Sequence, residues 1–405
     1  MDRIESALIK SVSFALKGEQ MTDDPGLSEA EWVALLKLAS EQEMLPLVFE
    51  SVMKCPSFIA MDKDVKRDLR DRAVALSARQ IVQTNEFLTL MLHLSERGFR
   101  PAVLKGIAVR RLYPKPMLRP SIDEDILILP GETEAIHGLL VGEGLTPDFE
   151  GSPKGRAELS YHRIGSPTYI EVHTDFFPKD SEAYGDCSSP FVGARERFVE
   201  LEEEDVSLLT PEPTDHLLYL MLHAYKHFLH SGMGLRHVCD IGIFAQKQET
   251  DPQRIRSVCD EMGLSRLFAA VFAIGSRYLG LEGYPAFSDI EADPEPLLED
   301  MLSGGLYGVE DINRAHSSTI TLEAVASHKK GRRKRGALHS VFLPRRELEG
   351  RYPYLKKHGW LLPAAWVQRG WSYIFSREKG PVNPGESLRI GRERVELLRR
   401  YGIID

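Results

Sequence analysis

The sequence has few cysteines, no excess of positive charge and no long hydrophobic run. Its four cysteines form no CxxC pair and no metal-site spacing, so neither a disulfide framework nor a cysteine metal site is expected. The formal net charge of -9 gives the chain as a whole no electrostatic attraction to nucleic acid. The apolar stretch LLPAAWV at 361–367 is too short to span a bilayer. These absences predict a cytoplasmic protein without a membrane partner.

The composition is that of an ordinary globular protein. Hydrophobic residues make up 42% of the chain and charged residues 27%, which is close to the average for soluble domains. A chain of 405 residues is long enough for more than one domain, because single cores stop growing near roughly 250 to 300 residues. No internal repeat is visible, so a repeat architecture is not expected.

The first 98 residues have helical periodicity throughout. We predict helices at about 3–17, 28–52 and 64–97, with Ser28 and Glu31 forming a capping box at the start of the second. The MDRIESALIKSVSFALKG segment carries acids and a lysine within its apolar pattern, which is typical of an amphipathic helix rather than a signal peptide. Residues 1–98 are therefore predicted to be an N-terminal helical region.

A mixed segment follows, and we predict a small α+β core over 99–205. A short apolar strand at 101–106 ends in glycine, and a second strand covers 123–129. Two further strands, at 158–165 and 168–177, are joined by the turn signal Gly165-Ser166-Pro167 and should pair antiparallel. The predicted helices of the core are at 106–113 and 131–144.

Helical patterns return after the core, and residues 206–405 are predicted to be a C-terminal helical region. The expected fold class is thus α+β, with a small mixed sheet between two helical regions. The residues from 305 to 345 are less patterned. The helices predicted after the core cover 212–230, 235–247, 252–262, 265–280 and 294–304.

Acidic residues open the strand DEDILIL. Side chains alternate along a strand, so Asp123 and Asp125 share one face while Glu124 points to the other. The same rule places Glu171 and His173 together on one face of IEVHTDF. If the two strands are neighbours, Glu171 completes a cluster of three acids with Asp123 and Asp125. Such an all-oxygen cluster suits Mg²⁺ or Mn²⁺.

The alternative is an exposed edge strand whose charges discourage aggregation, and the short DxD pattern does not decide between the two. The preceding LKG favours the metal site. A glycine at a helix start leaves backbone N–H groups for an anion, and Lys105 beside Gly106 adds a cation for a triphosphate. We therefore expect Lys105 and Gly106 to bind the phosphates of a nucleotide.

The chain contains the segments LKG, LRPSIDEDILIL and YIEVHTDF in this order. This series of motifs resembles the nucleotidyltransferase core of the DNA polymerase beta superfamily, in particular its large, mostly uncharacterised bacterial branch. The resemblance covers 101–176 and 215–242. It implies that Asp123 and Asp125 bind two metal ions and that Glu171 acts near the attacking hydroxyl. Gly106 would be the glycine of the helix turn, and Arg119 the arginine that precedes the acids.

The chain departs from the superfamily pattern at two positions. Ile107 follows Gly106 where a second glycine or a serine is usual. Glu124 stands where an apolar residue is usual, and its role is unexplained by the sequence. These departures affect the predicted contacts with the nucleotide phosphates more than they affect the predicted metal site.

The helix PTDHLLYLMLHAYKHFLHSG places His216, His223, His227 and His230 on one face. We expect His223, Lys226 and His227 to line the substrate side, with His173 also among the nucleotide-binding residues. The alternatives are a solvated polar face and a zinc site, although no HEXXH pattern is present.

Two further charged features follow the histidine helix. Arg236 and Asp240 are four residues apart, and the simplest interpretation is an ion pair within one helix, whereas the resembled family implies that both belong to the cleft. Six Lys or Arg occupy the seven positions 329–335. An RNA contact there is conceivable, but no aromatic residue is interleaved for base stacking, and a solvated loop is favoured.

These patterns predict a metal-dependent nucleotidyltransferase that moves an NMP group from an NTP, with ATP the expected donor, to an acceptor hydroxyl and releases pyrophosphate. Mg²⁺ or Mn²⁺ is the expected cofactor. The acceptor stays open between a small molecule, a protein and an RNA. The alternatives are a catalytically inactive binding or scaffold protein and, less favoured, a DxD glycosyltransferase, which would normally have a Rossmann-like region before its acids.

Overall fold

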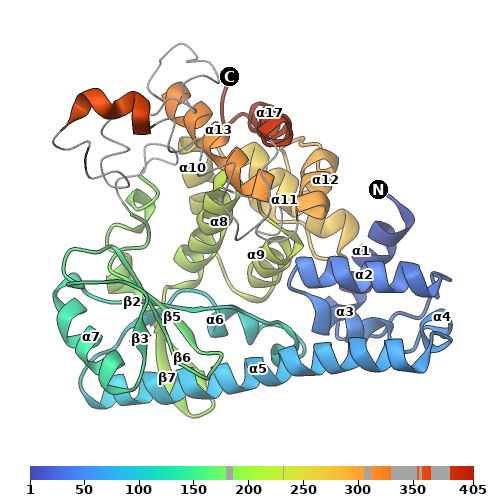
Figure 1. Cartoon of the computed structure of the whole chain (residues 1–405), viewed down its shortest axis with the longest axis horizontal. Coiled ribbons are helices and arrows are strands. Elements are labelled where there is room, and N and C mark those ends of the chain that lie inside the picture. Colours follow the sequence, from blue (N-terminus) through green and yellow to red (C-terminus); the bar gives the residue numbers. More distant parts are fainter. Residues whose placement is uncertain (179–185, 231, 305–311, 330–353, 355–357, 366–383) are drawn as a thin grey trace.

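The computed structural model describes the chain except for residues 179–185, 231, 305–311, 330–353, 355–357 and 366–383. A seven-stranded mixed sheet lies at one end of the molecule, and helices from both ends of the chain pack beside and above it (Figure 1). The predicted α+β class, with a small mixed sheet flanked by helical regions, is confirmed.

The N-terminal region is helical, but the predicted helix over 28–52 is wrong. The chain breaks there into α2 (Glu29–Glu41) and α3 (Leu45–Val52), and Glu43 between them has a left-handed φ of 52°. Pro46 lacks the N–H that a continuous helix would need. The capping box of Ser28 and Glu31 is present. The remaining helices of the region are α1 (Arg3–Leu16), α4 (Pro56–Ile59) and α5 (Lys63–Glu96).

The sheet has the strand order β3-β4-β5-β2-β1-β7-β6. The predicted antiparallel pairing of β4 (Glu158–His162) with β5 (Tyr169–His173) is confirmed. β5 also pairs in parallel with β2 (Glu124–Leu127), and β2 pairs antiparallel with β1 (Ala102–Val103). β3 (Thr146–Pro147) adds an edge beside β4. The strands with the predicted acids are therefore neighbours at the centre of the sheet.

A hairpin that the sequence patterns do not predict completes the sheet. β6 (Val199–Glu203) and β7 (Val206–Thr210) pair antiparallel, and β7 pairs in parallel with β1. The two residues between the strands, Glu204 and Asp205, both have positive φ angles, 46° and 65°, as two-residue hairpins require. The usual Asn-Gly or Asp-Gly signal is absent there. The sheet thus continues past residue 205, where the sequence placed the end of the core.

One face of the sheet is apolar and covered by helices α5 and α7 (Thr133–Gly142). Ile126 of β2 and Val172 of β5 are buried there with Phe87 of α5 and Leu140 of α7. Because side chains alternate along a strand, the residues next to Ile126 and Val172 point to the opposite face. That opposite face carries the acids and lies toward helix α8.

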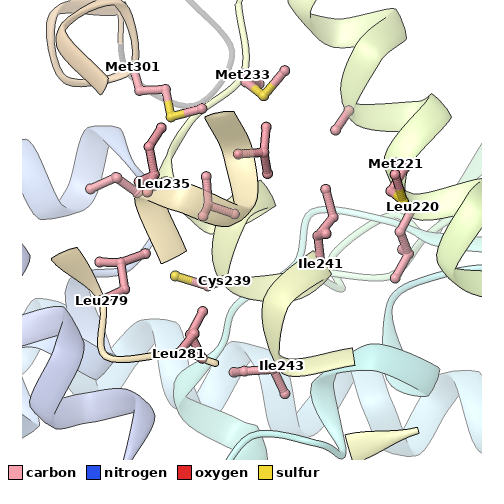
Figure 2. Close-up of a cluster of buried hydrophobic side chains, with 14 of the residues drawn as sticks. Leu220, Met221, Met233, Leu235, Cys239, Ile241, Ile243, Leu279, Leu281 and Met301 are labelled. Carbon is pink, nitrogen blue, oxygen red and sulfur yellow. The ribbon is translucent and has the colours of Figure 1, made fainter. Parts of the chain in front are cut away.

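The C-terminal region packs its helices around an apolar cluster. Figure 2 shows buried side chains from α8, α9, the chain after α11, and α12 meeting there, among them Leu220, Leu235, Cys239 and Leu281. The five helices predicted after the core are present as α8 (Pro213–His230), α9 (Leu235–Lys247), α10 (Pro252–Glu261), α11 (Ser265–Tyr278) and α12 (Glu295–Gly304).

Two more helices, α13 (Ile312–Lys329) and α17 (Pro384–Arg400), were not predicted and pack together beside α8. Apart from Lys329 at the end of α13, the basic segment lies outside the described residues. None of the described helices has the length and apolar composition of a membrane-spanning segment.

Candidate active site

Two of the three predicted acids face each other across adjacent strands. Asp125 of β2 is in register with Glu171 of β5, so their side chains emerge from the same face of the sheet about 5 Å apart. Asp125 is fully buried and Glu171 is partly exposed. Oxygens of both carboxylates and a ring nitrogen of His173 lie within 4.8 Å of one another. The predicted adjacency of these strands is therefore found.

Lys105 connects the third acid to this cluster. Its Nζ atom lies 3.2 Å from Asp123 Oδ2 and 3.1 Å from Asp125 Oδ2. The same atom is 3.5 Å from His223 Nε2 on α8. Backbone pairing fixes this arrangement, because Leu104 N donates to Asp125 O at 3.0 Å just before Lys105. One ammonium thus lies between the two aspartates of the DxD pattern.

His173 holds the other side of Asp125. Its Nε2 lies 2.9 Å from Asp125 Oδ1 and 3.7 Å from Glu171 Oε2, while Nδ1 lies 3.8 Å from Glu158 Oε2 on β4. Since the carboxylate can only accept, the proton of this contact belongs to Nε2. His173 therefore orients the carboxylate of Asp125 in addition to facing the cluster.

The electrostatics of the cluster follow from burial and from this crowding of acids. Burial and the charges of Asp125 and Asp123 raise the pKa of Glu171 to about 7. Burial also opposes ionisation of Asp125, but Lys105 and the hydrogen bond from His173 outweigh it and lower the pKa of Asp125. The same contact with Asp125 raises the pKa of His173 against the effect of burial. The negative charges of Asp123, Asp125 and Glu171 together exceed the positive charge of Lys105 beside them.

This donor set fits a hard divalent cation. Asp125 and Glu171 supply carboxylate oxygens on one face, and Asp123 is joined to them through Lys105. Mg²⁺ and Mn²⁺ prefer such oxygen ligands. An additional cation would relieve the like-charge repulsion that raises the pKa of Glu171. His173 donates its Nε2 proton to Asp125, so in this arrangement it orients a carboxylate ligand and is not itself a ligand.

The turn at Gly106 contradicts part of the sequence prediction and explains Glu124. Gly106 has φ 58°, and a Cβ there would lie 1.9 Å from Glu124 Oε2. The Ile107 N–H donates to Glu124 Oε2 at 2.9 Å, and Arg110 donates to Glu124 Oε1 at 2.8 Å. The amide predicted to be bare for a phosphate is therefore bound to a carboxylate of the chain itself. The Ile107 amide is therefore not available to a phosphate, whereas Lys105 and Gly106 both line the cleft.

Arg236 and Asp240 do not form the ion pair that their spacing indicates. Asp240 accepts from Arg119 through two hydrogen bonds, at 2.9 and 2.5 Å, and from the Tyr113 hydroxyl at 2.7 Å. Arg236 pairs instead with Glu43 in the α2–α3 turn and donates to Pro120 O at 3.0 Å. These contacts tie α9 to the loop before β2 and to the N-terminal helices.

A cleft separates the sheet from helices α8 and α9, and most of the predicted residues line it. Asp123 is on the sheet side with Ser121. Sequence reasoning did not single out His237 or Ser121. His237 was within reach of the sequence, since it adjoins Arg236 in GLRHVCD, whereas Ser121 carries no signal of its own. The cleft is lined by Lys105, Gly106, Arg119, Ser121, Asp123, Leu220, His223, Arg236, His237, Asp240 and Ile241.

A comparison with protein families matches residues 28–280 to a family described as uncharacterised nucleotidyltransferase. The chain belongs to this nucleotidyltransferase family. The match begins at the capping residue of α2 and ends just after α11, so it includes the acids, the Gly106 turn and the cleft. Comparisons with curated proteins and with solved structures found no match to the chain.

The histidine helix α8 divides into two parts. His216 is buried against the sheet, with Nε2 2.6 Å from Leu104 O and Nδ1 3.0 Å from Thr210 Oγ1. His223 and His227 lie nearer the site, with their Nε2 atoms 2.9 Å apart. Burial, helped by nearby cations such as Lys105, lowers the pKa of both well below the usual range. His216 is buried and His223 lines the cleft, so these two histidines do not belong to a freely solvated polar face.

Five of the predicted residues do not line this cleft: Asp125, Glu171 and His173 of the acid cluster, and Lys226 and His227 of α8. Lys226 extends toward β4, where its Nζ is 3.8 Å from Glu158 Oε2. His227 stands behind His223, with its ring centroid 5.3 Å from that of His237. Among the described residues, only Asp125, Glu171 and His173 bring three possible metal ligands together, so the histidine helix lacks a third ligand for zinc.

Proposed function

We propose that this chain is a metal-dependent enzyme that transfers an NMP group from an NTP to an acceptor hydroxyl. The observation that carries the proposal is the register of Asp125 with Glu171, with Asp123 joined to them through Lys105. We further propose that the family is a bacterial branch of the DNA polymerase beta superfamily, on the resemblance of LKG, the DxD strand and the strand with Glu171.

Asp123, Asp125 and Glu171 would hold Mg²⁺ or Mn²⁺. When bound, such ions supply charge neutralisation at the phosphoryl oxygens and at the attacking and leaving oxygens. Lys105 and Arg236, which both line the cleft, would face the phosphates of the nucleotide. Arg119 would act indirectly on the nucleotide, because its guanidinium is already paired with Asp240. ATP is the proposed donor.

A side chain of the protein would accept the proton that the attacking hydroxyl loses. The acceptor oxygen forms a bond to the α-phosphorus while the bond to the bridging oxygen of the β-phosphate breaks, and pyrophosphate leaves. Glu171 lies on the strand beside Asp125 and would accept the hydroxyl proton, a role suited to a carboxylate that is partly exposed at the rim of the cluster. Most of the rate enhancement would come from positioning and charge neutralisation.

A transfer assay tests the proposal. Protein, Mg²⁺ and cell extract are incubated with α-labelled ATP, and label on any acceptor is followed for wild type and for Asp123→Ala/Asp125→Ala. The matched control is Asp68→Ala/Asp71→Ala, which removes two exposed acids from α5. We expect transfer by wild type and control only, and fractionation of the labelled product shows whether the acceptor is a small molecule, a protein or an RNA.

Label transfer that persists in the Asp123→Ala/Asp125→Ala variant would contradict the proposed site. A wild-type protein that binds neither ATP nor Mg²⁺ would support the inactive binding or scaffold alternative. The family match favours nucleotidyl over glycosyl transfer, so a sugar nucleotide is not the proposed donor.

A further inference from the structure

Lys105 occupies the position of a cation between two aspartates. Its ammonium is 3.2 Å from Asp123 Oδ2 and 3.1 Å from Asp125 Oδ2, and the exposed fractions of the three side chains are 14%, 17% and 0%. Ion pairs on the open surface are weak because solvent and salt screen them. This one is largely shielded from solvent, so its charges interact strongly.

The two oxygens of Asp125 have different contacts: Oδ1 accepts a hydrogen bond, whereas Oδ2 accepts none from the described residues and has only the ion pair with Lys105. Oδ1 faces His173 Nε2 at 2.9 Å, and Oδ2 faces Lys105 Nζ. A divalent cation that binds Asp125 through Oδ2 must therefore displace the ammonium or share the carboxylate with it. Two cations about 3 Å apart repel each other strongly in a site of low dielectric.

Lys105 is the group that can move. His173 is fixed by the strand pairing of β5 with both β2 and β4. Lys105 has a flexible stem of four methylene groups and follows β1 at the start of the Gly106 turn. Its side chain lines the cleft together with Arg236, which is where the proposed function places the phosphates. A nucleotide in the cleft would offer the ammonium phosphate oxygens as alternative anionic partners.

We propose that Lys105 is a resident counter-ion that makes metal binding depend on the nucleotide. The inference rests on the proposed function. In the free protein Lys105 neutralises Asp123 and Asp125 and opposes an incoming divalent cation. With a triphosphate in the cleft, the ammonium transfers to phosphate oxygens and the aspartates become available to the metal. Linkage then requires nucleotide and metal to raise each other's affinity by the same factor.

The inference specifies the ligand class that opens the metal site. A ligand with several phosphate groups gives Lys105 a new partner, whereas a nucleoside has no charge to attract it. Adenosine should therefore leave the metal affinity of the free protein unchanged.

Titration with Mn²⁺, with free ion followed by electron paramagnetic resonance, tests this directly. It compares wild type, Lys105→Met and the control Lys37→Met, which removes an exposed lysine of α2. Each is titrated alone, with α,β-methylene-ATP and with adenosine. Without nucleotide, Lys105→Met should bind Mn²⁺ about tenfold more tightly than wild type or control. The analogue should raise the wild-type affinity by about tenfold and that of Lys105→Met much less.

The outcomes separate the two proposals. Equal Mn²⁺ affinity of wild type and Lys105→Met without nucleotide overturns the role of Lys105 while leaving the proposed function intact. Absence of Mn²⁺ binding by wild type, even with the analogue, overturns the proposed function and this inference with it. Lys105→Arg keeps the charge and should reproduce the weak Mn²⁺ binding of the nucleotide-free wild type, which distinguishes loss of charge from a damaged fold.

Discussion

The carboxylate of Glu124 and the guanidinium of Arg110 form an ion pair of 2.8 Å beneath the Gly106 turn, with 0% and 2% of the two side chains exposed. Glu124 also accepts from the Ile107 N–H, while Arg110 donates to Ser121 and Thr84. An acid that looks out of place in the strand sequence thus fixes the turn that carries Lys105. The buried ion pair of Glu124 and Arg110 therefore fixes the position of the Gly106 turn in the candidate site.

Removal of Glu124 alone should be far more damaging than removal of the pair. Glu124→Ala leaves the Arg110 charge buried without its carboxylate, and a cost of about 3 to 5 kcal/mol is expected. Glu124→Leu combined with Arg110→Met replaces the pair by apolar groups of similar volume and should cost less than the sum of the single changes. Urea unfolding of the four proteins measures this coupling. Strictly additive losses would show that the pair does not act as a unit.

Gly106 should tolerate no side chain. Alanine there would adopt φ 58° and place its Cβ 1.9 Å from Glu124 Oε2, so we expect Gly106→Ala to lower the free energy of unfolding by about 2 kcal/mol or more. Gly138→Ala is the control, because Gly138 is inside α7 and a Cβ there meets no atom within 4 Å. That change should be neutral or stabilise by up to about 1 kcal/mol. Similar losses for both glycines would argue against a special role of the turn.

Replacement of Glu171 should separate activity from stability. Glu171→Gln removes a carboxylate that Asp125 and Asp123 repel, so the melting temperature of the metal-free protein should stay the same or rise. The amide accepts no proton and is a poor ligand for a hard cation, so label transfer should fall by about 100-fold or more. Glu200→Gln, on edge strand β6 with 62% of its side chain exposed, is the control and should leave transfer unchanged. Equal transfer by Glu171→Gln and wild type would remove Glu171 from the mechanism.

Acid should destabilise the fold through buried histidines. Burial lowers the pKa of His216 from 6.5 to about 4, so the unfolded chain binds a proton between these values that the folded protein does not. The stabilisation is complete above pH 6.5 and is lost as the pH falls toward 4, by about 3 kcal/mol at most for this residue. His223 and His227 act in the same direction.

Urea unfolding at several values between pH 7.5 and pH 5 measures this dependence. His216→Gln cannot bind the proton and should show a shallower fall of the free energy of unfolding than wild type, although it is less stable at pH 7.5. The control His162→Gln changes a partly exposed histidine of β4 whose contact is with Asp148. Parallel curves for wild type and His216→Gln would contradict the assignment.

The parts of the site that depend on short-range pattern could be predicted from sequence. Alternation along a strand placed Asp125 and Glu171 on matching faces, and the structure brings their strands together in register. The capping box of Ser28 and Glu31 and the antiparallel pairing of β4 with β5 are of the same kind. The β6–β7 hairpin was missed because its turn, Glu204-Asp205, lacks the residues that usually permit positive φ.

The sequence by itself determined strands β1, β2, β4 and β5 and most of the helices. It also determined the placement of the acids on one face and the family to which the chain belongs, because each depends on residues close together or on a fixed period. Only the tertiary structure decided the partners of the charged groups. Arg236 pairs with Glu43, 193 positions away, rather than with Asp240 on its own helix, and Glu124 turns out to hold Arg110 and the Ile107 amide. A buried charge must be satisfied by whichever group the fold brings within reach, and spacing along the chain does not reveal that group.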